Sequence, residues 1–156
     1  MLICFLRHAE AEHDAESDFE RQLTPKGTEQ AAKAGKFLIR AGISPDLIIT
    51  SPVVRARQTA SIVSKALDAD LVEARWLACG MKPETCLREI AVHSTKVAIL
   101  LVGHEPDFSA AIAELVGLPD PSALNICKAS LTVIDLVEPM SGCGQLQFLI
   151  PVRLMS

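Results

Sequence analysis

Two arginines and two histidines stand close behind short apolar runs of the sequence. Arg7 and His8 follow the first run, Arg55 comes shortly after the second, and His104 follows a run of six aliphatic residues. An arginine side chain is a planar fork that matches the oxygens of a phosphate, and a histidine titrates near physiological pH. Taken singly, each residue would be interpreted as a solvated charge or a hydrogen-bonded structural residue. Together they predict a pocket that handles an anion, provided that the fold unites them.

Arg55 stands where a helix by itself would not favour a cation. Ser51 and Pro52 predict the start of a helix, so Arg55 falls within its first turn. The positive end of the helix dipole disfavours a cation there. An anion held between Arg55 and the helix start would offset that penalty. We therefore interpret Arg55 as part of an anion-binding site.

The elements that must position these residues alternate between strands and helices. Apolar runs predict strands at 2–6, 47–50, 70–72 and 97–102, and helical spacing with Pro and Gly at the ends predicts helices at 25–41, 52–67, 83–93 and 106–116. Alternation at 130–137 and 145–150 predicts a terminal hairpin. This order predicts an α/β three-layer sandwich, with a mostly parallel, mixed central sheet, helices on both faces and a C-terminal antiparallel hairpin. Sites in such sheets form beyond the carboxyl ends of strands.

The composition narrows the classes of function. The 156 residues suffice for one domain, predicted to span 1–156, and the net charge of -4 argues against nucleic acid as a partner. No apolar stretch approaches the roughly 20 residues of a transmembrane helix, so we expect no membrane partner. The five cysteines have no zinc-site spacing, and we expect no metal and no cofactor. The first apolar run is too short for a signal peptide, so we expect a cytoplasmic protein.

Four short segments together carry a family resemblance. They are Leu-Arg-His-Ala-Glu-Ala-Glu at 6–12, Leu-Thr-Pro-Lys-Gly at 23–27, Ser-Pro-x-x-Arg-Ala-x-Gln-Thr-Ala at 51–60 and Val-Gly-His-Glu-Pro at 102–106. In this order they resemble the histidine phosphatase (phosphoglycerate mutase-like) superfamily. The short chain, and Arg-His-Ala in place of the usual Arg-His-Gly, resemble its SixA-type phosphohistidine phosphatases. The resemblance spans residues 1 to about 117 and, more loosely, the terminal hairpin.

The resemblance implies a role for each residue of the pocket. His8 matches the nucleophile that becomes phosphorylated on a ring nitrogen, and Arg7 and Arg55 match the phosphate-binding arginines. His104 matches the second pocket histidine, which would donate to the phosphate if protonated. Arg21 stands where SixA-type proteins often have a further phosphate-binding arginine, or it is a solvated loop charge. Because His8 must be neutral to attack, we expect its other ring nitrogen to donate to a backbone carbonyl.

The proton donor for the leaving group lies in no clear motif. Glu84 and Glu73 are candidates by region, and Asp18 and Glu20 are candidates from the first loop; each could equally be a solvated charge. A weak general acid would modestly favour a phosphohistidine substrate, because imidazole leaves more easily than an alkoxide and can carry its own proton.

Three further charged residues, within or after the last of these segments, could influence the pocket. Glu105 and Asp107 stand where relatives often have Asn and Gly, so they could raise the pKa of His104 and repel highly anionic small substrates. Lys128 precedes the terminal hairpin and could line the pocket mouth or be solvated.

The sequence therefore favours a metal-independent phosphatase that works through a phosphohistidine enzyme intermediate. The short chain lacks room for the insertions that form a lid, and an open pocket suits a phosphohistidine that projects from a protein helix. Its expected partner is therefore a phosphohistidine-bearing protein, either HPt-like in a phosphorelay or a phosphotransfer protein. The alternatives are a small-molecule phosphomonoesterase of the same superfamily, acting on a small phosphorylated substrate, and a non-catalytic phosphate-binding module.

Overall fold

A computed structural model describes residues 1–156 of the chain. The strands are β1 (Leu2–Arg7), β2 (Leu47–Thr50), β3 (Leu71–Glu73), β4 (Ala98–Gly103), β5 (Leu131–Leu136) and β6 (Gly144–Ile150). The α-helices are α1 (Pro25–Arg40), α2 (Val54–Leu67), α3 (Pro83–Val92) and α4 (Asp107–Val116). Short 3-10 helices are η1 (Asp18–Glu20), η2 (Arg75–Leu77), η3 (Pro121–Ala123) and η4 (Val152–Leu154). None of the helices is both long and apolar enough to cross a membrane.

All six strands join one mixed sheet in the order β3-β2-β4-β1-β5-β6. The first four strands along the chain run parallel, because β4 pairs in parallel with both β1 and β2, and β2 pairs in parallel with β3. β5 runs antiparallel to β1 and forms the hairpin with β6. The structure thus confirms the mostly parallel sheet and its antiparallel C-terminal hairpin.

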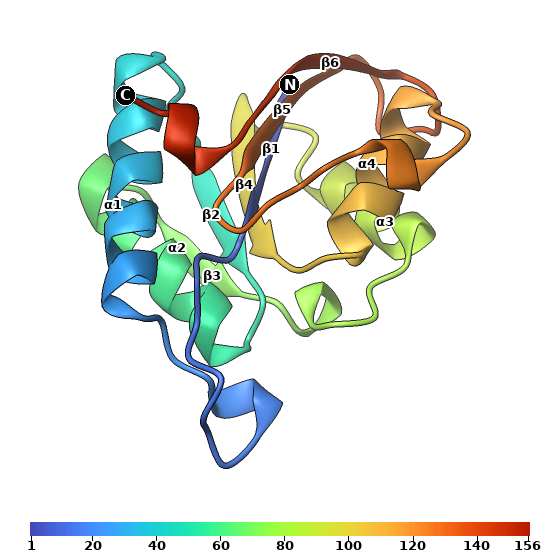
Figure 1. Ribbon diagram of the computed structural model, residues 1–156. Coiled ribbons are helices and arrows are strands. Elements are labelled where there is room, and N and C mark those ends of the chain that lie inside the picture. Colours follow the sequence, from blue (N-terminus) through green and yellow to red (C-terminus); the bar gives the residue numbers. More distant parts are fainter.

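The sheet is the middle of three layers (Figure 1). α1 and α2 cover one face through small and branched side chains such as Ala34, Leu38 and Val63, which pack on alternate residues of β1 and β4. α3 and α4 cover the other face, where Phe108 and Ile112 belong to a second apolar cluster. Nearly every aliphatic residue of β4 is inaccessible to solvent because helices bury it on both sides.

Helix α2 begins later than Ser51 and Pro52 predict. Its first residue is Val54, and its N-cap residue Val53 makes no side-chain capping bond. Ser51 instead uses its Oγ to accept from the Val53 backbone N–H at 3.2 Å and to contact the ring of His104. The serine interpreted as a helix cap is therefore part of the loop that follows β2. Arg55 still falls in the first turn of α2, as the sequence predicts.

The Leu-Thr-Pro-Lys-Gly segment anchors α1 on the loop that follows β1. Thr24 caps α1 by accepting from the Gly27 N–H at 2.9 Å, and its own N–H donates to the Glu10 carbonyl at 3.1 Å. Gly27 is buried against the same carbonyl so closely that a Cβ at this position would overlap the Glu10 oxygen. The segment therefore requires glycine at position 27, because the backbone of α1 closely approaches Glu10. Glu10 directly follows His8 and Ala9 in the loop after β1.

We expect Gly27→Ala to lower the free energy of unfolding by about 2 kcal/mol, because the added methyl group must push α1 away from Glu10. Urea denaturation of the two proteins measures the difference. Gly35→Ala is the matched control in the same helix, since its Cβ would lie 3.1 Å from the Ala66 Cβ and in ordinary contact with Val63, with no backbone atom closer than 3.6 Å. A loss as large in Gly35→Ala as in Gly27→Ala would contradict this account of the motif.

Candidate active site

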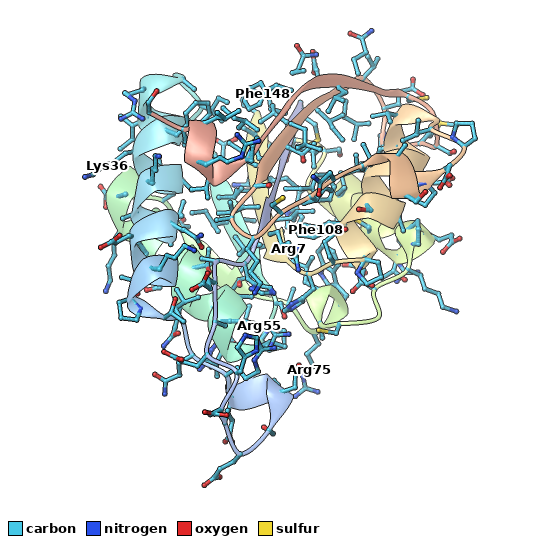
Figure 2. All side chains as sticks on the ribbon, in the orientation of Figure 1. Arg7, Lys36, Arg55, Arg75, Phe108 and Phe148 are labelled. Atoms are coloured by element: carbon cyan, nitrogen blue, oxygen red, sulfur yellow. The ribbon has the colours of Figure 1, made fainter.

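The register of the sheet brings the three polar strand ends together. β4 lies between β2 and β1. Beyond the last paired residues, the Ser51 N–H donates to the Val102 carbonyl at 3.0 Å and the His8 N–H donates to the Gly103 carbonyl at 2.9 Å. The rings of His8 and His104 consequently lie 5.3 Å apart between centroids. Figure 2 shows Arg7 and Arg55 one below the other at this end of the sheet, and Phe148 toward the opposite end of the sheet.

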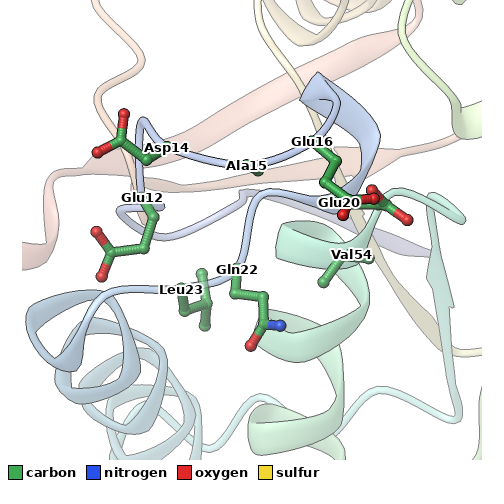
Figure 3. Close-up of a pocket in the computed structure, with 8 residues that line it drawn as sticks. All are labelled: Glu12, Asp14, Ala15, Glu16, Glu20, Gln22, Leu23 and Val54. Carbon is green, nitrogen blue, oxygen red and sulfur yellow. The ribbon is translucent and has the colours of Figure 1, made fainter.

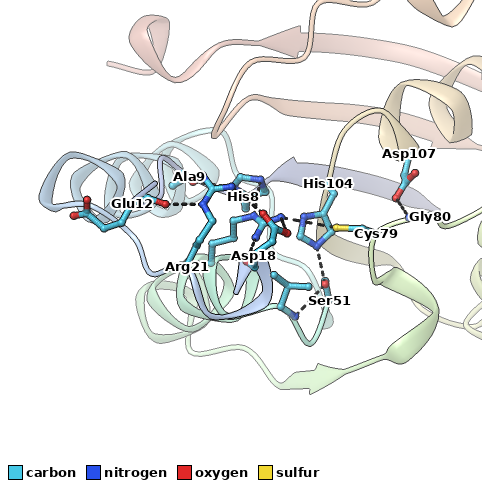
Figure 4. Close-up of polar contacts among 12 residues, drawn as sticks. His8, Ala9, Glu12, Asp18, Arg21, Ser51, Cys79, Gly80, His104 and Asp107 are labelled. Atoms are coloured by element: carbon cyan, nitrogen blue, oxygen red, sulfur yellow. Dashed lines mark hydrogen bonds and ion pairs between the residues drawn. The ribbon is translucent and has the colours of Figure 1, made fainter. Parts of the chain in front are cut away.

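The His8 ring is held in one neutral tautomer (Figure 4). Its Nδ1 lies 2.8 Å from the carbonyl oxygen of Ala9. A carbonyl oxygen only accepts, so Nδ1 carries the proton and Nε2 offers a lone pair. That lone pair accepts a hydrogen bond from Arg55 Nε at 3.2 Å. Burial lowers the pKa of His8 to about 3, and the charge of Arg55 acts in the same direction. His8 is therefore a neutral imidazole at neutral pH, with a proton on Nδ1 and none on Nε2, as a nucleophile requires.

Arg55 is a buried cation, and each of its three guanidinium nitrogens donates a hydrogen bond. Besides its bond to His8, its Nη1 donates to the backbone carbonyl of Asp18 at 2.8 Å, and its Nη2 donates to the Asp18 carboxylate at 3.2 Å. Its Nη2 also lies 3.9 Å from the sulfur of Cys79. The cation that the sequence places in the first turn of α2 thus contacts His8 and holds the Asp18 carboxylate.

Two buried nitrogen atoms beside His8 have no hydrogen-bond partner in the protein. Arg7 donates through Nη1 to the Ile126 carbonyl at 2.8 Å, but its buried Nε has no acceptor. His104 places Nε2 at 2.7 Å from Ser51 Oγ, and its buried Nδ1 has no partner. Leaving buried polar groups unpaired costs about 1–3 kcal/mol each, so such groups mark a place where a polar ligand would be stabilised. An oxyanion bound beside His8 could satisfy an unpaired N–H group of this kind.

The charge state of His104 differs from the one considered from the sequence. Burial lowers its pKa to about 4, and the charge of Arg55 lowers it further, so the ring is neutral in the empty site. The expectation that Glu105 and Asp107 could raise this pKa is wrong. Glu105 accepts from the N–H and hydroxyl of Ser109 in α4, and Asp107 accepts from the backbone N–H groups of Gly80 and Met81. Both carboxylates hold loops in place.

Thr59 is a positioning residue that sequence reasoning missed. Its Oγ1 accepts from the Ala9 N–H at 3.0 Å and donates to the Arg55 carbonyl at 2.7 Å. The hydroxyl therefore ties the loop that carries His8 to the helix that carries Arg55. The available signal was the spacing, since Thr59 lies one helical turn after Arg55 and on the same face.

Arg21 lies on Asp18 in this structure. Its Nη1 donates to the Asp18 carboxylate at 3.1 Å and its Nε donates to the Glu12 carbonyl at 2.6 Å. Lys128 precedes Ala129, whose N–H lies 3.1 and 3.2 Å from the carbonyls of Arg7 and His8, and its charge contributes to the lowered pKa of Glu10 after Lys26 and Thr24. Neither cation makes a hydrogen bond to His8 or His104.

Of the four carboxylates considered as proton donors, only Asp18 contacts the residues of the site. Glu73 pairs with Arg57 at the surface, Glu20 accepts from Ser17, and Glu84 is exposed without a hydrogen bond or ion pair. Hydrogen bonding to Arg21 and the charge of Arg55 lower the pKa of Asp18. Asp18 is thus ionised at neutral pH, which makes it a poor proton donor in the empty site.

The hollow beside the site is acidic. It has a volume of about 600 Å³, and its lining residues are Glu12, Asp14, Ala15, Glu16, Glu20, Gln22, Leu23 and Val54 (Figure 3). None of the four residues predicted to bind phosphate lines it. Its four carboxylates disfavour an anionic ligand, so the phosphate site is better sought at His8. No three His, Cys, Asp or Glu side chains gather in a way that could hold a metal ion.

A three-layer sandwich with an Arg-His pair after its first strand and a second histidine after the central strand matches the histidine phosphatases. The family model described as "Histidine phosphatase superfamily (branch 1)" matches residues 3–79. A relative described as a phosphohistidine phosphatase SixA homolog, from Haemophilus influenzae, is 33% identical over 132 residues, covering 78% of this chain and 80% of that protein. The chain belongs to the histidine phosphatase superfamily, and it is an enzyme of the phosphatase class.

The resemblance to SixA-type proteins is confirmed. The solved structure of the protein histidine phosphatase SixA complexed with tungstate covers 100% of both chains with a TM-score of 0.91, at 21% identity, which supports the fold. The mitochondrial serine/threonine-protein phosphatase PGAM5 of Xenopus tropicalis is 42% identical over 65 residues. That match covers 42% of this chain but only 23% of the PGAM5 protein.

Proposed function

We propose that the protein removes the phosphoryl group from phosphohistidine on another protein, through a phospho-His8 intermediate and without a metal ion. One observation carries the proposal. The lone pair of His8 Nε2 stands next to the Arg55 guanidinium, while buried nitrogens of Arg7 and His104 lack partners. A nucleophile surrounded by unsatisfied or cationic groups suits a phosphoryl group, whose transfer needs an in-line nucleophile and charge stabilisation.

The first half of the reaction transfers the phosphoryl group to the enzyme. The hydrogen bond from Arg55 Nε to His8 Nε2 is released, and the Nε–H turns to a phosphoryl oxygen. The freed lone pair of Nε2 attacks phosphorus and forms a new N–P bond as the N–P bond of the substrate breaks. The arginine forks of Arg7 and Arg55 stabilise the equatorial oxygens, and His104 Nδ1 faces them as a donor when Nε2 accepts the Ser51 hydroxyl proton. The carbonyl of Ala9 keeps the proton on Nδ1 throughout the attack. Water then hydrolyses phospho-His8 and restores the neutral ring.

The leaving group favours phosphohistidine over a phosphate ester. The one carboxylate in contact with the site, Asp18, has a lowered pKa and would protonate an alkoxide poorly. A phosphohistidine can leave as neutral imidazole when its distal nitrogen already carries a proton. The substrate protein is then of the phosphorelay or phosphotransfer type, in which histidine is the phosphorylated residue.

Initial rates on a protein phosphorylated at histidine, beside a panel of sugar, nucleotide and aryl phosphate esters, test the substrate. We expect kcat/KM on the phosphohistidine protein to exceed that on every ester. A clear preference for a sugar or nucleotide ester would replace the proposed substrate with a small molecule and would leave the role of His8 intact.

A further inference from the structure

Asp18 holds Arg55 in the way that a phosphate would. The backbone carbonyl and the carboxylate of this one residue take Nη1 and Nη2 of Arg55, at 2.8 and 3.2 Å. These two nitrogens are the outward fork of the guanidinium, because Nε is already engaged with His8 Nε2. A phosphoryl group in line with His8 needs the same fork. Phosphate and Asp18 cannot both use it fully.

We propose that Asp18 is an internal competitor of the phosphate, which occupies Nη1 and Nη2 of Arg55 and is displaced when a phosphoryl group binds. The inference rests on the proposed function, because it requires that the phosphate binds Arg55. It gives Asp18 a role different from that of a proton donor.

The exposure of Arg55 and Asp18 indicates which of the two side chains can move when phosphate binds. The side chain of Arg55 is 6% exposed and that of Asp18 is 67% exposed. Every residue from 12 to 20 is exposed, and the segment is fastened at its base by the bridge between Ala11 and Leu23. Figure 1 shows the segment projecting from the body of the molecule below α2. Moving Asp18 therefore disturbs no packed core, whereas Arg55 is fixed by its helix and by His8.

The charges of the segment set the strength of the competition. Arg21 and Arg55 lower the pKa of Asp18, so a full negative charge opposes the phosphate at neutral pH. Arg21 also donates to the Glu12 carbonyl at 2.6 Å, which holds the segment in the closed arrangement. Acidic residues occupy every second position from Glu10 to Glu20, so an incoming anion meets further repulsion. If the open form is about a tenth of the molecules, the apparent phosphate affinity falls about 10-fold.

Isothermal titration of inorganic phosphate into wild-type protein, Asp18→Asn and Glu16→Gln at pH 7 tests the competition. Glu16 is a matched control, because it lies in the same segment, has the same charge and makes no hydrogen bond or ion pair. We expect Asp18→Asn to bind phosphate about 10-fold more tightly than wild type, and Glu16→Gln to stay within about twofold. Equal or weaker binding by Asp18→Asn would overturn the inference, as would equal tightening by both variants or the absence of phosphate binding in all three.

Arg55→Gln separates this inference from the proposed function. If Arg55→Gln binds phosphate as tightly as wild type, the phosphate does not use Arg55 and the proposed function fails with the inference. If Arg55→Gln weakens binding but Asp18→Asn does not tighten it, only the inference fails.

Trypsin cleavage after Arg21 in wild-type protein gives a second measurement that needs no variant. Displacement of Asp18 should free the segment, so saturating phosphate should speed this cleavage relative to the same concentration of chloride. Protection by phosphate, or no change in rate, would overturn the displacement.

Discussion

His8→Gln is expected to lower kcat by about 10,000-fold or more, since His8 is the proposed site of the covalent intermediate and His104, the other imidazole of the site, is assigned to bind the phosphoryl oxygens. The neutral tautomer set by Ala9 presents Nε2 to the substrate, and glutamine offers only an amide there. Rapid quenching with a radiolabelled phosphohistidine protein measures both kcat and the acid-labile label on the enzyme. Wild type should carry that label, and His8→Gln should not.

His13→Gln is the control for His8→Gln. His13 is exposed in the segment beside the site and makes no hydrogen bond or ion pair, so its replacement should leave kcat within about twofold. Far-UV circular dichroism shows whether each variant is folded. Turnover by His8→Gln within about 10-fold of wild type would remove His8 as the nucleophile.

The elements of the fold could be predicted from the sequence because their signals are local. The apolar run Leu47–Thr50 coincides with β2, and the alternation before Ile150 coincides with β6. Pro25 is the first residue of α1, Pro106 directly precedes α4, and a left-handed glycine follows each of the two helices. The strand order was not predictable in the same way. It depends on β4 pairing between β2 and β1, which is a contact between distant residues.

In the candidate site, too, the residues with local signals could be predicted and their tertiary partners could not. Arg7 ends β1, and His8, Arg55 and His104 come after strands. The structure brings the four residues together because parallel strands end at one edge of the sheet. Their partners are set by tertiary contacts that no short pattern reveals. Thr59 supports the loop of His8 from a helix 50 residues away along the chain. Asp18 reaches Arg55 across 37 residues, and only that long-range contact brings the local Arg21–Asp18 pair to the site.

The two buried histidines make the free energy of unfolding depend on pH. Each is neutral in the folded protein, with a pKa lowered from 6.5 to about 3 for His8 and to about 4 for His104. In the unfolded chain both would take up a proton near pH 6.5. The unfolded state therefore binds more protons between pH 6.5 and 4, and stability rises with pH across that window. Carboxylates with a lowered pKa, such as Asp18, lose their contribution only as the pH falls below about 4.

The free energy of unfolding is accordingly expected to fall by about 4 kcal/mol between pH 6.5 and pH 4.5, about half from each histidine. That is a large part of the stability of a domain of this size. Urea denaturation at half-unit steps of pH measures the fall. In His8→Gln the fall should shrink to about 2 kcal/mol, because only His104 then takes up a proton on unfolding. A fall of the same size in His8→Gln would mean that burial of His8 does not set the acid sensitivity of the protein. A halved fall would show that the neutral nucleophile is held against its own tendency to protonate, by the burial and by the cations that it needs for attack.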